Sequence, residues 1–339
     1  MSPVGGNRGV MLRALALHEQ GRRFALALVT DTEGSTYRKP GALALVADDG
    51  ERVGAISGGC LEPALDQLAH EALASGRVAV ALFDTRGDDD LVFGSGSGCR
   101  GRMRVLAWPV APGAHGFFDA LCESQADGAA LELVLAVDAG VAGRGLAWRG
   151  NRRFDLDPPP AADALHDAAP GLHQRQGALF ARLRIAPPPR LLLIGAGPEA
   201  PAMLRLANTL GWVAEVADHR EALLQPARLG GTQALRHGRP AAVLSALAAA
   251  PDAALVMTHV ASTDLEALRA LAGMPVGYVG LLGPPGRRDE LMGQLTAAER
   301  AALEPRLRAP VGLALGGEGP EAIAMAVAAQ LQQFFHAGP

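Results

Sequence analysis

The chain has 339 residues and a formal net charge of −4, and it is 49% hydrophobic and 4% aromatic. Because domains usually contain about 100–200 residues, this length predicts two or three domains with ample core-forming residues. The small negative charge and the few aromatic rings argue against a nucleic-acid-binding protein, which neutralises phosphates and stacks on bases. The first residues lack a secretory signal, and the most apolar window is broken by Pro251 and Asp252, so we expect a cytoplasmic protein without a membrane segment.

Three cysteines and one lysine are the scarce reactive side chains. Cys60, Cys99 and Cys122 cannot all pair, and such a count is typical of a reducing compartment. Each thiol therefore needs an explanation as packing or as chemistry. Lys39 is the only lysine, so any lysine chemistry is restricted to one place.

The first third of the chain mixes helical and strand-like patterns. A helix is predicted at 61–73, where apolar residues recur on one face and Gly76 follows as a stop. Strand patterns flank Asp48-Asp49-Gly50, a sequence typical of a hairpin turn. The other predicted elements are a helix at 10–17 and strands at 24–29, 42–46, 53–56, 78–83 and 103–108.

The middle of the chain carries no chemical motif. Strands are predicted at 131–137 and 145–148, and the histidines lack the spacing of metal ligands, which favours structural or surface roles for His115, His166 and His173. Proline clusters, which are typical of linkers or stiff loops, occur at 108–113, 157–160 and 186–189. They predict an N-terminal domain at 1–110, a middle segment at 111–186 and a C-terminal domain at 187–339.

The last part of the chain alternates strands and helices, which predicts an α/β fold with a doubly wound parallel sheet covered on both faces. Thr263 and Glu266 have the spacing of a capping box for the helix that follows Met257. Pro320 suits the first turn of a closing helix. The predicted strands are 190–194, 213–217, 254–257 and 276–281, and the predicted helices are 200–210, 265–271 and 321–335.

A glycine-rich turn joins the first strand of this part to its first helix. Gly195 permits the tight turn, Gly197 lets a pyrophosphate approach the backbone, and Ala200 allows close helix packing. Asp218 ends the second strand, where an acidic residue meets a ribose hydroxyl in dinucleotide-binding folds. We therefore predict a Rossmann-like domain. Whether NAD(P) binds there is a separate question, because folds outlive their ligands.

A second glycine-rich turn, Ser57-Gly58-Gly59-Cys60, ends a strand and places Cys60 at the start of the helix at 61–73. Backbone amides at a helix start stabilise anions, and a thiolate is an anion. Cys60 is therefore placed to hold a reactive sulfur, a metal or a persulfide. The alternative is a small buried cysteine in a tight turn.

A third glycine-rich segment occupies residues 94–101. Glycine at every second position prevents regular structure but lets backbone amides surround an anion. Cys99 and Arg100 add a thiol and a permanent charge to this segment. The alternative is a flexible loop.

The segment 31–41 is expected to connect two strands as a loop. It combines hydroxyl groups with Arg38 and Lys39, and such a loop can bind a phosphate or a carboxylate. It could equally be a solvated connection.

His259 follows a predicted strand and lies five residues before Asp264. In a dehydrogenase it could serve as an acid or a base, and otherwise it could orient its loop. The chain has no Walker phosphate loop, no H-E-x-x-H, no paired C-x-x-C and no G-x-S-x-G motif.

Taken in chain order, these segments resemble the XdhC/CoxI family. The matches run through the whole chain and follow the order of the family's own motifs. The matching residues are 34–41, 56–62, 93–101, 191–200 with Asp218 and Arg220, 258–264, 278–283, 310–313 and 320–324.

The resemblance implies both a fold and a role. Members of the family are accessory proteins of molybdenum hydroxylases such as xanthine dehydrogenase. They bind and protect newly made molybdenum cofactor, support its sulfuration by a cysteine desulfurase, and deliver it to the apoenzyme. The resemblance also implies a homodimer in which an N-terminal α/β domain with a mixed sheet accompanies the Rossmann-like domain.

On this resemblance the cofactor is molybdopterin or its cytidine dinucleotide form, and the protein itself is not an enzyme. Cys60 and Cys99 would contact molybdenum or a transferred sulfur, because thiolates suit such a metal. The other implied cofactor contacts are Ser57, Gly58, Gly59, Arg38, Lys39, Arg100, Gly195, Gly197, Asp218 and His259.

The chain departs from the family pattern at two places. Arg100 stands where the family commonly has glycine, and Gly283-Pro284-Pro285-Gly286-Arg287-Arg288 replaces a Gly-Ser-Arg turn. Two alternative functions stay open. One is an NAD(P)-dependent oxidoreductase that uses Asp218 on the ribose and His259 as acid or base. The other is an adaptor that recruits a hydroxylase without touching its cofactor.

Overall fold

The computed structural model describes residues 4–86, 100–112 and 116–336. They form two compact units, of which the first spans Gly5–Pro188 and the second begins at Pro189. The boundary lies in the third proline cluster. The first proline cluster is not a linker at its start, because strand β5 (Gly101–Val110) runs through Pro109.

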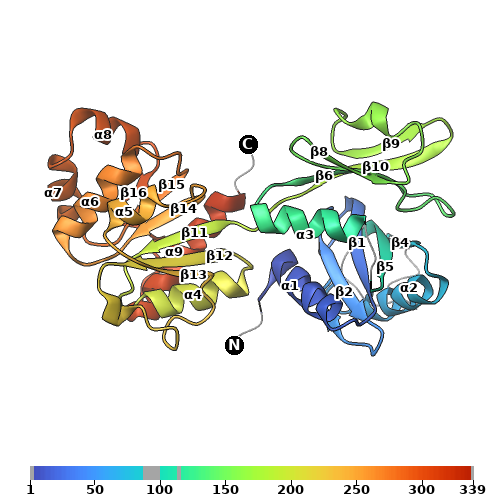
Figure 1. Cartoon of the computed structure of the whole chain (residues 1–339), viewed down its shortest axis with the longest axis horizontal. Helices are drawn as coiled ribbons and strands as arrows, with labels where there is room; N and C mark the ends of the chain where they lie inside the picture. Colours follow the sequence, from blue (N-terminus) through green and yellow to red (C-terminus); the bar gives the residue numbers. More distant parts are fainter. Residues whose placement is uncertain (1–3, 87–99, 113–115, 337–339) are drawn as a thin grey trace. The chain divides into compact units, whose positions relative to one another are not determined.

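The N-terminal unit contains two five-stranded sheets (Figure 1). The first has the strand order β3-β2-β1-β5-β4, the second has the order β8-β7-β6-β10-β9, and their strands pair antiparallel. The remaining strands are β1 (Phe24–Gly34), β2 (Leu43–Ala47), β3 (Arg52–Val53), β4 (Ala79–Asp84), β6 (Leu131–Ala136), β7 (Gly145–Arg149), β8 (Arg152–Leu156), β9 (Gly171–Arg175) and β10 (Ala178–Ile185).

Two cores lie on opposite faces of the first sheet. Alternate residues of β1 enter different cores, Ala25 and Ala27 on one face and Leu26 and Leu28 on the other. Helix α2 (Glu62–Ser75) covers the alanine face, and it ends at Gly76, whose φ of +66° fits the predicted stop. Helices α1 (Gly6–Glu19) and α3 (Phe117–Asp127) and the second sheet contribute to the core on the leucine face.

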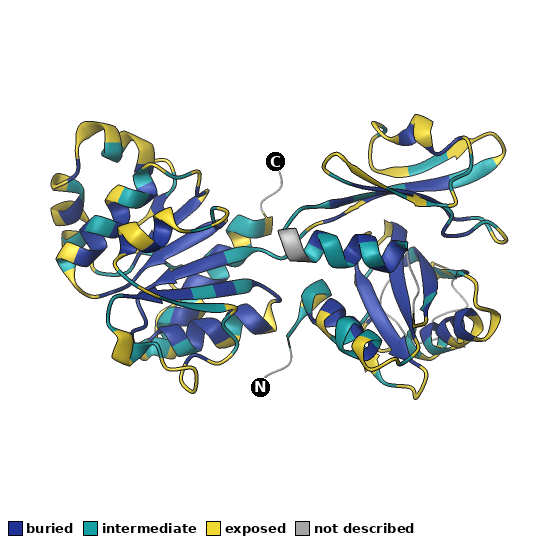
Figure 2. Cartoon of the chain, in the orientation of Figure 1, coloured by how far each residue is buried: buried dark blue, intermediate teal, exposed yellow. Residues whose placement is uncertain are grey.

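The C-terminal unit is a six-stranded parallel sheet with the order β13-β12-β11-β14-β15-β16, the doubly wound arrangement of a Rossmann fold. Its strands are buried between helices whose outer faces are exposed (Figure 2). The strands are β11 (Arg190–Ile194), β12 (Val213–Asp218), β13 (Ala234–His237), β14 (Ala253–Val256), β15 (Tyr278–Leu281) and β16 (Leu307–Arg308). The helices are α4 (Ala200–Thr209), α5 (Pro240–Ser245), α6 (Ala261–Ala272), α7 (Pro285–Gly293), α8 (Ala297–Leu303) and α9 (Gly319–His336).

The predicted α/β class and the C-terminal Rossmann-like domain are confirmed. The N-terminal sheets are antiparallel where a mixed sheet was expected. The prediction of a loop at 31–41 is wrong for its first residues, because β1 continues to Gly34 after a bulge at Val29 and Asp31. Cross-strand ion pairs of Asp31 with Arg104 and of Glu33 with Arg102 support this extension.

The predicted capping box is also wrong. Helix α6 begins at Ala261 after Val260, so Thr263 lies within its first turn and is buried. Glu266 instead accepts hydrogen bonds from Arg239 and from the backbone N–H of Ala241. No helix in the described part of the chain is long and apolar enough to cross a membrane.

Candidate functional site

A hollow in the N-terminal unit forms where three of the sequence motifs meet. It has a volume of about 350 Å³, which includes space open to solvent. It lies on the α2 face of the first sheet, beside the end of β1 and the start of β5. Its lining residues are Ser35, Thr36, Tyr37, Ile56, Ser57, Gly58, Cys60, Leu61, Phe83, Thr85, Gly101 and Met103. We call it the Cys60 hollow.

Two glycines bring the first and third motifs together. Gly34 and Gly101 are the last register partners of β1 and β5, and the Ser35 N–H donates to the Arg100 carbonyl at 3.2 Å. A Cβ atom on Gly101 would lie 2.4 Å from the Ser35 carbonyl oxygen, a distance no side chain can accept. Glycine at this position therefore permits the contact that closes one side of the hollow.

Ser57 shapes the turn that carries Cys60. Its buried hydroxyl accepts the N–H groups of Gly59 at 3.1 Å and Leu61 at 3.0 Å, and it donates to Glu62 at 2.5 Å. The hydroxyl is thus used within the turn, much as a capping residue is used at a helix start. Cys60 is half-buried, and it lies in the turn rather than at the helix start, because α2 begins at Glu62.

The predicted cations lie on the motif loops but outside the lining of the hollow. Arg38 is half-buried and Lys39 is exposed, with its Nζ 3.4 Å from the Thr36 hydroxyl. The Thr36 hydroxyl donates to the Arg38 carbonyl at 2.9 Å, which holds the loop together. Arg100 is exposed. Cys99 lies outside the described residues.

The hollow also contains residues that the sequence patterns did not single out. Phe83 and Met103 belong to predicted strands, and Tyr37 belongs to a motif loop, where its side chain is 59% exposed. Strand alternation could have placed Phe83 and Met103 on one face, because they are direct partners in the β4–β5 register. The sequence does not reveal that register, so these apolar walls were missed.

Cys122, which lies in none of the sequence motifs, has a packing role. It is half-buried on α3 and packs against the core between the two sheets. Burial, and to a lesser extent Asp119 and Glu123, raises the pKa of its thiol to about 12. Cys122 therefore stays a neutral thiol at physiological pH.

In the C-terminal unit, contacts inside the protein explain the first glycine of the Rossmann turn. Gly195 has a φ of +126°, and a Cβ there would lie 2.4 Å from the Met257 carbonyl oxygen. A Cβ on Gly197 would lie 3.1 Å from Glu199 Oε2 and 3.4 Å from His259 Nε2, which are the ends of flexible side chains. Gly195 is therefore required by the fold itself, whereas the fold does not by itself require glycine at position 197.

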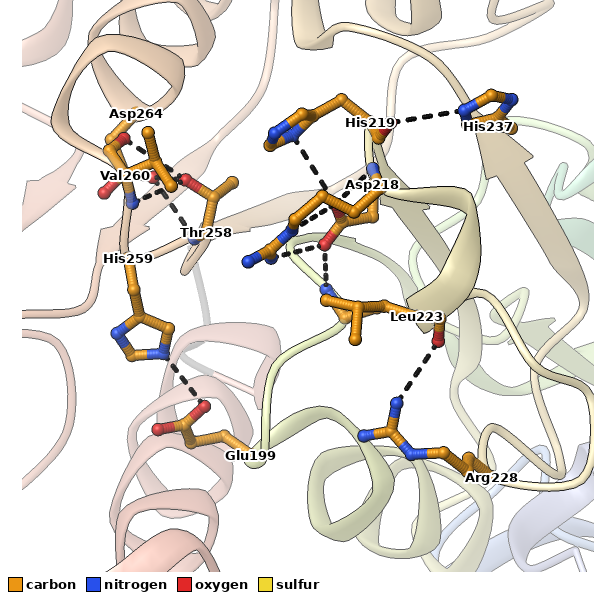
Figure 3. A network of polar contacts seen from close by, with 12 residues as sticks. Glu199, Asp218, His219, Leu223, Arg228, His237, Thr258, His259, Val260 and Asp264 are labelled. Atoms are coloured by element: carbon orange, nitrogen blue, oxygen red, sulfur yellow. Dashed lines mark hydrogen bonds and ion pairs between the residues drawn. The ribbon is translucent and has the colours of Figure 1, made fainter.

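The carboxylate of Asp218 is occupied by its own surroundings (Figure 3). Oδ2 accepts from the Ala196 N–H and from Arg220 Nη2, both at 2.8 Å, and Oδ1 accepts from the N–H and Nε of Arg220 at 2.8 and 2.9 Å. Burial opposes the charged form, but the bonds from Arg220 and Ala196 outweigh it and lower the pKa of Asp218. A contact of Asp218 with a ribose stays a prediction.

His259 and Glu199 form a pair above Gly197. Their Nε2 and Oε2 atoms are 3.2 Å apart, and the side chains are 49% and 10% exposed (Figure 3). His259 holds a φ of +62°, which is uncommon for a side chain other than glycine. The pair places a carboxylate beside Gly197, where the pyrophosphate approaches the backbone in dinucleotide-binding Rossmann folds, and a negative charge there would repel it.

A buried carboxylate also organises the turn after β14. Asp264 accepts from the Thr258 hydroxyl and from Arg287 Nη2, each at 2.6 Å. The altered family turn supplies that arginine, because α7 begins at Pro285 and carries Arg287 in its first turn. Within residues 4–86, 100–112 and 116–336, no three His, Cys, Asp or Glu side chains lie together as a metal site.

Comparisons with known proteins agree with this arrangement. Residues 17–84 match the model described as "XdhC and CoxI family", and residues 191–331 match the "XdhC Rossmann domain". A Bacillus subtilis protein that is named as a probable subunit of xanthine dehydrogenase is 31% identical over 334 residues, which is 97% of each chain. The chain belongs to the XdhC and CoxI family. Membership makes it an accessory protein rather than a catalytic one.

Two further relatives extend this result. An Escherichia coli protein named YqeB is 27% identical over 97% of this chain, which corresponds to 47% of YqeB. A crystal structure described as a xanthine dehydrogenase from Bacillus halodurans is 26% identical, with a TM-score of 0.81 over 97% of this chain and 96% of that one. The similarity covers both units of the fold.

Proposed function

We propose that this protein holds molybdenum cofactor for a molybdenum hydroxylase such as xanthine dehydrogenase. The observation that carries the proposal is the Cys60 hollow, where three motif segments meet around a half-buried thiol. The Bacillus subtilis relative, whose name refers to xanthine dehydrogenase, supports the choice of client.

The donor set of the hollow suits a sulfur-rich, phosphorylated cargo. Cys60 offers a soft sulfur ligand of the kind that metals with sulfur ligands accept. The backbone N–H groups of Gly58 and Cys60 donate to no acceptor among the described residues, and free amides in a glycine-rich turn favour an anion. Molybdopterin or its cytidine dinucleotide form would meet both kinds of group here.

The apolar walls of the hollow support a protective role. Phe83, Met103 and Ile56 give the hollow apolar surface on the α2 side of the sheet, which lessens contact of a bound group with water. Water exclusion slows hydrolysis of a reactive intermediate, and a sulfido ligand on molybdenum is such a group. The protein would therefore hold the cofactor without turning it over.

We also propose that a cysteine desulfurase reaches the cargo while it is held, and that the protein acts as a homodimer. A half-buried Cys60 leaves one side of the hollow open, as sulfur transfer from a second protein requires. Native mass spectrometry would give the number of chains in the assembly and the mass of any bound cofactor form.

Cofactor transfer to an apoenzyme tests the function. The protein is purified from a molybdate-fed host that makes the cofactor, and in parallel from a host that cannot make it. Each preparation is mixed with an apo-xanthine dehydrogenase, and the gain in dehydrogenase activity is measured. We expect activation only by the first preparation, and equal activation by both would reject the proposal.

A further inference from the structure

A second hollow in the N-terminal unit is distinct from the Cys60 hollow. It has a volume of about 990 Å³, which includes space open to solvent. It lies on the opposite face of the β1–β5 ribbon, because Arg102 lines it while Gly101 and Met103 line the Cys60 hollow, and residues alternate faces along a strand. Its lining residues are Thr30, Asp31, Thr32, Glu33, Pro40, Arg102, Pro170, Gly171, Leu172, Arg182, Leu183 and Arg184. We call it the arginine hollow.

A carboxylate beside one wall of this hollow is shared between two arginines that line it. Glu132 lies 2.5 Å from Arg182 and 3.2 Å from Arg184, which is its direct partner across β6 and β10. One carboxylate thus balances two arginines. Since Arg182 is only 11% exposed, its excess charge is poorly screened by water.

The opposite wall carries further ion pairs. Glu33 lies 2.8 Å from Arg86 and 2.9 Å from Arg102, and Arg86 also pairs with Asp84 at 2.6 Å. Beside them, Asp31 and Arg104 form a pair at 3.3 Å with side chains only 10% and 11% exposed. Counted with Glu132 and its two partners, five arginines meet four carboxylates around the hollow, an excess of one positive charge.

One buried guanidinium atom on this wall also lacks an acceptor. Arg102 Nε is inaccessible to solvent and finds no hydrogen-bond acceptor among the described residues, whereas Arg104 Nη1 keeps only its ion-pair contact with Asp31 at 3.3 Å. An unsatisfied buried donor of a charged group is costly, and proteins usually satisfy such donors with a partner or a ligand. This observation is independent of the charge count and points to the same kind of ligand.

We propose that the arginine hollow binds a phosphate group. A planar guanidinium group presents paired N–H donors that match phosphate oxygens, and several of them surround this space. The hollow includes space open to solvent, so a phosphorylated small molecule can reach it. This site is separate from the Cys60 hollow, and the proposal holds whether or not the pterin cofactor binds there.

Calorimetric titration of the purified full chain tests this site. The probes are inorganic phosphate and glycerol 3-phosphate, with glycerol as the uncharged control. We expect both anions to bind and glycerol not to bind. Tighter binding of glycerol 3-phosphate would identify a monoester as the ligand, and tighter binding of inorganic phosphate would identify the free ion.

Two variants and a matched control locate the binding. Arg184→Gln alters a side chain that is 57% exposed, and Arg102→Gln alters one that is 28% exposed, so both should fold. Each should weaken anion binding at least about tenfold, or about 1.4 kcal/mol, because each removes a charge-assisted hydrogen bond. Arg175→Gln removes the same charge from the exposed end of β9 outside the lining and should change nothing. Absence of anion binding, or equal weakening in all three variants, would overturn the proposal.

Discussion

At the scale of single residues, buried carboxylates bind partners inside the C-terminal unit. Asp218 is 2% exposed and receives four hydrogen bonds from Ala196 and Arg220. Its position at the end of β12 could be predicted from the sequence. Its partners could not, because they depend on how the β11–α4 turn folds back on the strand.

Asp218→Asn should lower the free energy of unfolding by about 2 kcal/mol at pH 7, because it weakens hydrogen bonds to a charged group. The pKa of Asp218 is lowered below its ordinary value of 3.8. At a pH between the folded and unfolded pKa values, the unfolded chain is therefore protonated at this carboxyl while the folded chain is not. This contribution is present above that ordinary value and is lost as the pH falls through the folded pKa. Urea unfolding of the variant and wild type should therefore converge on acidification. Asp289→Asn, an exposed change on α7, is the control, and a constant difference at all pH values would contradict the argument.

We predict that Glu199 disfavours dinucleotide binding at the Rossmann turn. Wild type should show no saturable binding of NADH in a fluorescence titration, because the Glu199 carboxylate lies against Gly197. Glu199→Gln removes that charge and should bind NADH more tightly than wild type, whereas Glu221→Gln, in the 3₁₀ turn Glu221–Leu223, should not. Saturable binding by wild type would favour the oxidoreductase alternative, and no gain in Glu199→Gln would show that another feature excludes the nucleotide.

At the scale of elements, the turn before α2 and the β1–β5 ribbon build the Cys60 hollow. The sequence predicted both strands, the helix and the glycine motifs from local patterns. It could not predict that β1 continues to Gly34, because the supporting ion pairs join residues about 70 positions apart, Asp31 with Arg104 and Glu33 with Arg102. For the same reason the lining residues Phe83 and Met103 were missed.

In the middle segment, elements were missed for a different reason, because their sequence patterns are short or weak. Helix α3 was not predicted, although Phe117, Phe118 and Leu121 have helical spacing and are buried. The helix has 11 residues, and polar residues interrupt its apolar face, so its pattern is short. Strands β8 and β9 are largely exposed and lack the apolar alternation by which strands are recognised.

Ser57→Ala should loosen the turn that holds Cys60. It removes the acceptor for two N–H groups and the donor to Glu62, and the loss of such a cap costs about 1–2 kcal/mol. Thermal unfolding should show this loss. Ser75→Ala, in the last turn of the same helix, removes an exposed bond to Glu71 and should cost less. Equal effects of the two changes would contradict the role assigned to Ser57.

At the scale of the whole molecule, composition excluded several classes of function but did not identify one. The proposed function depends on where scarce residues lie: Cys60 lies where three motif segments meet, whereas Cys122 lies in no motif and packs against a core. Family membership agrees with the order of motifs along the chain. The sequence alone could not show that Arg38 and Lys39 lie outside the lining, because loop conformation decides where a long side chain reaches.

The amount of cofactor that copurifies with the protein tests the central claim most directly. Wild type, Cys60→Ser and Cys122→Ser are purified from a molybdate-fed host, and the pterin is oxidised to its fluorescent form and counted per chain. Cys122→Ser is the control, because it makes the same chemical change at a thiol outside the hollow. Burial raises the pKa of that thiol to about 12. We predict that wild type and Cys122→Ser retain similar amounts of pterin and that Cys60→Ser retains much less. Equal retention by wild type and Cys60→Ser would contradict the assignment of the Cys60 hollow as the cofactor site.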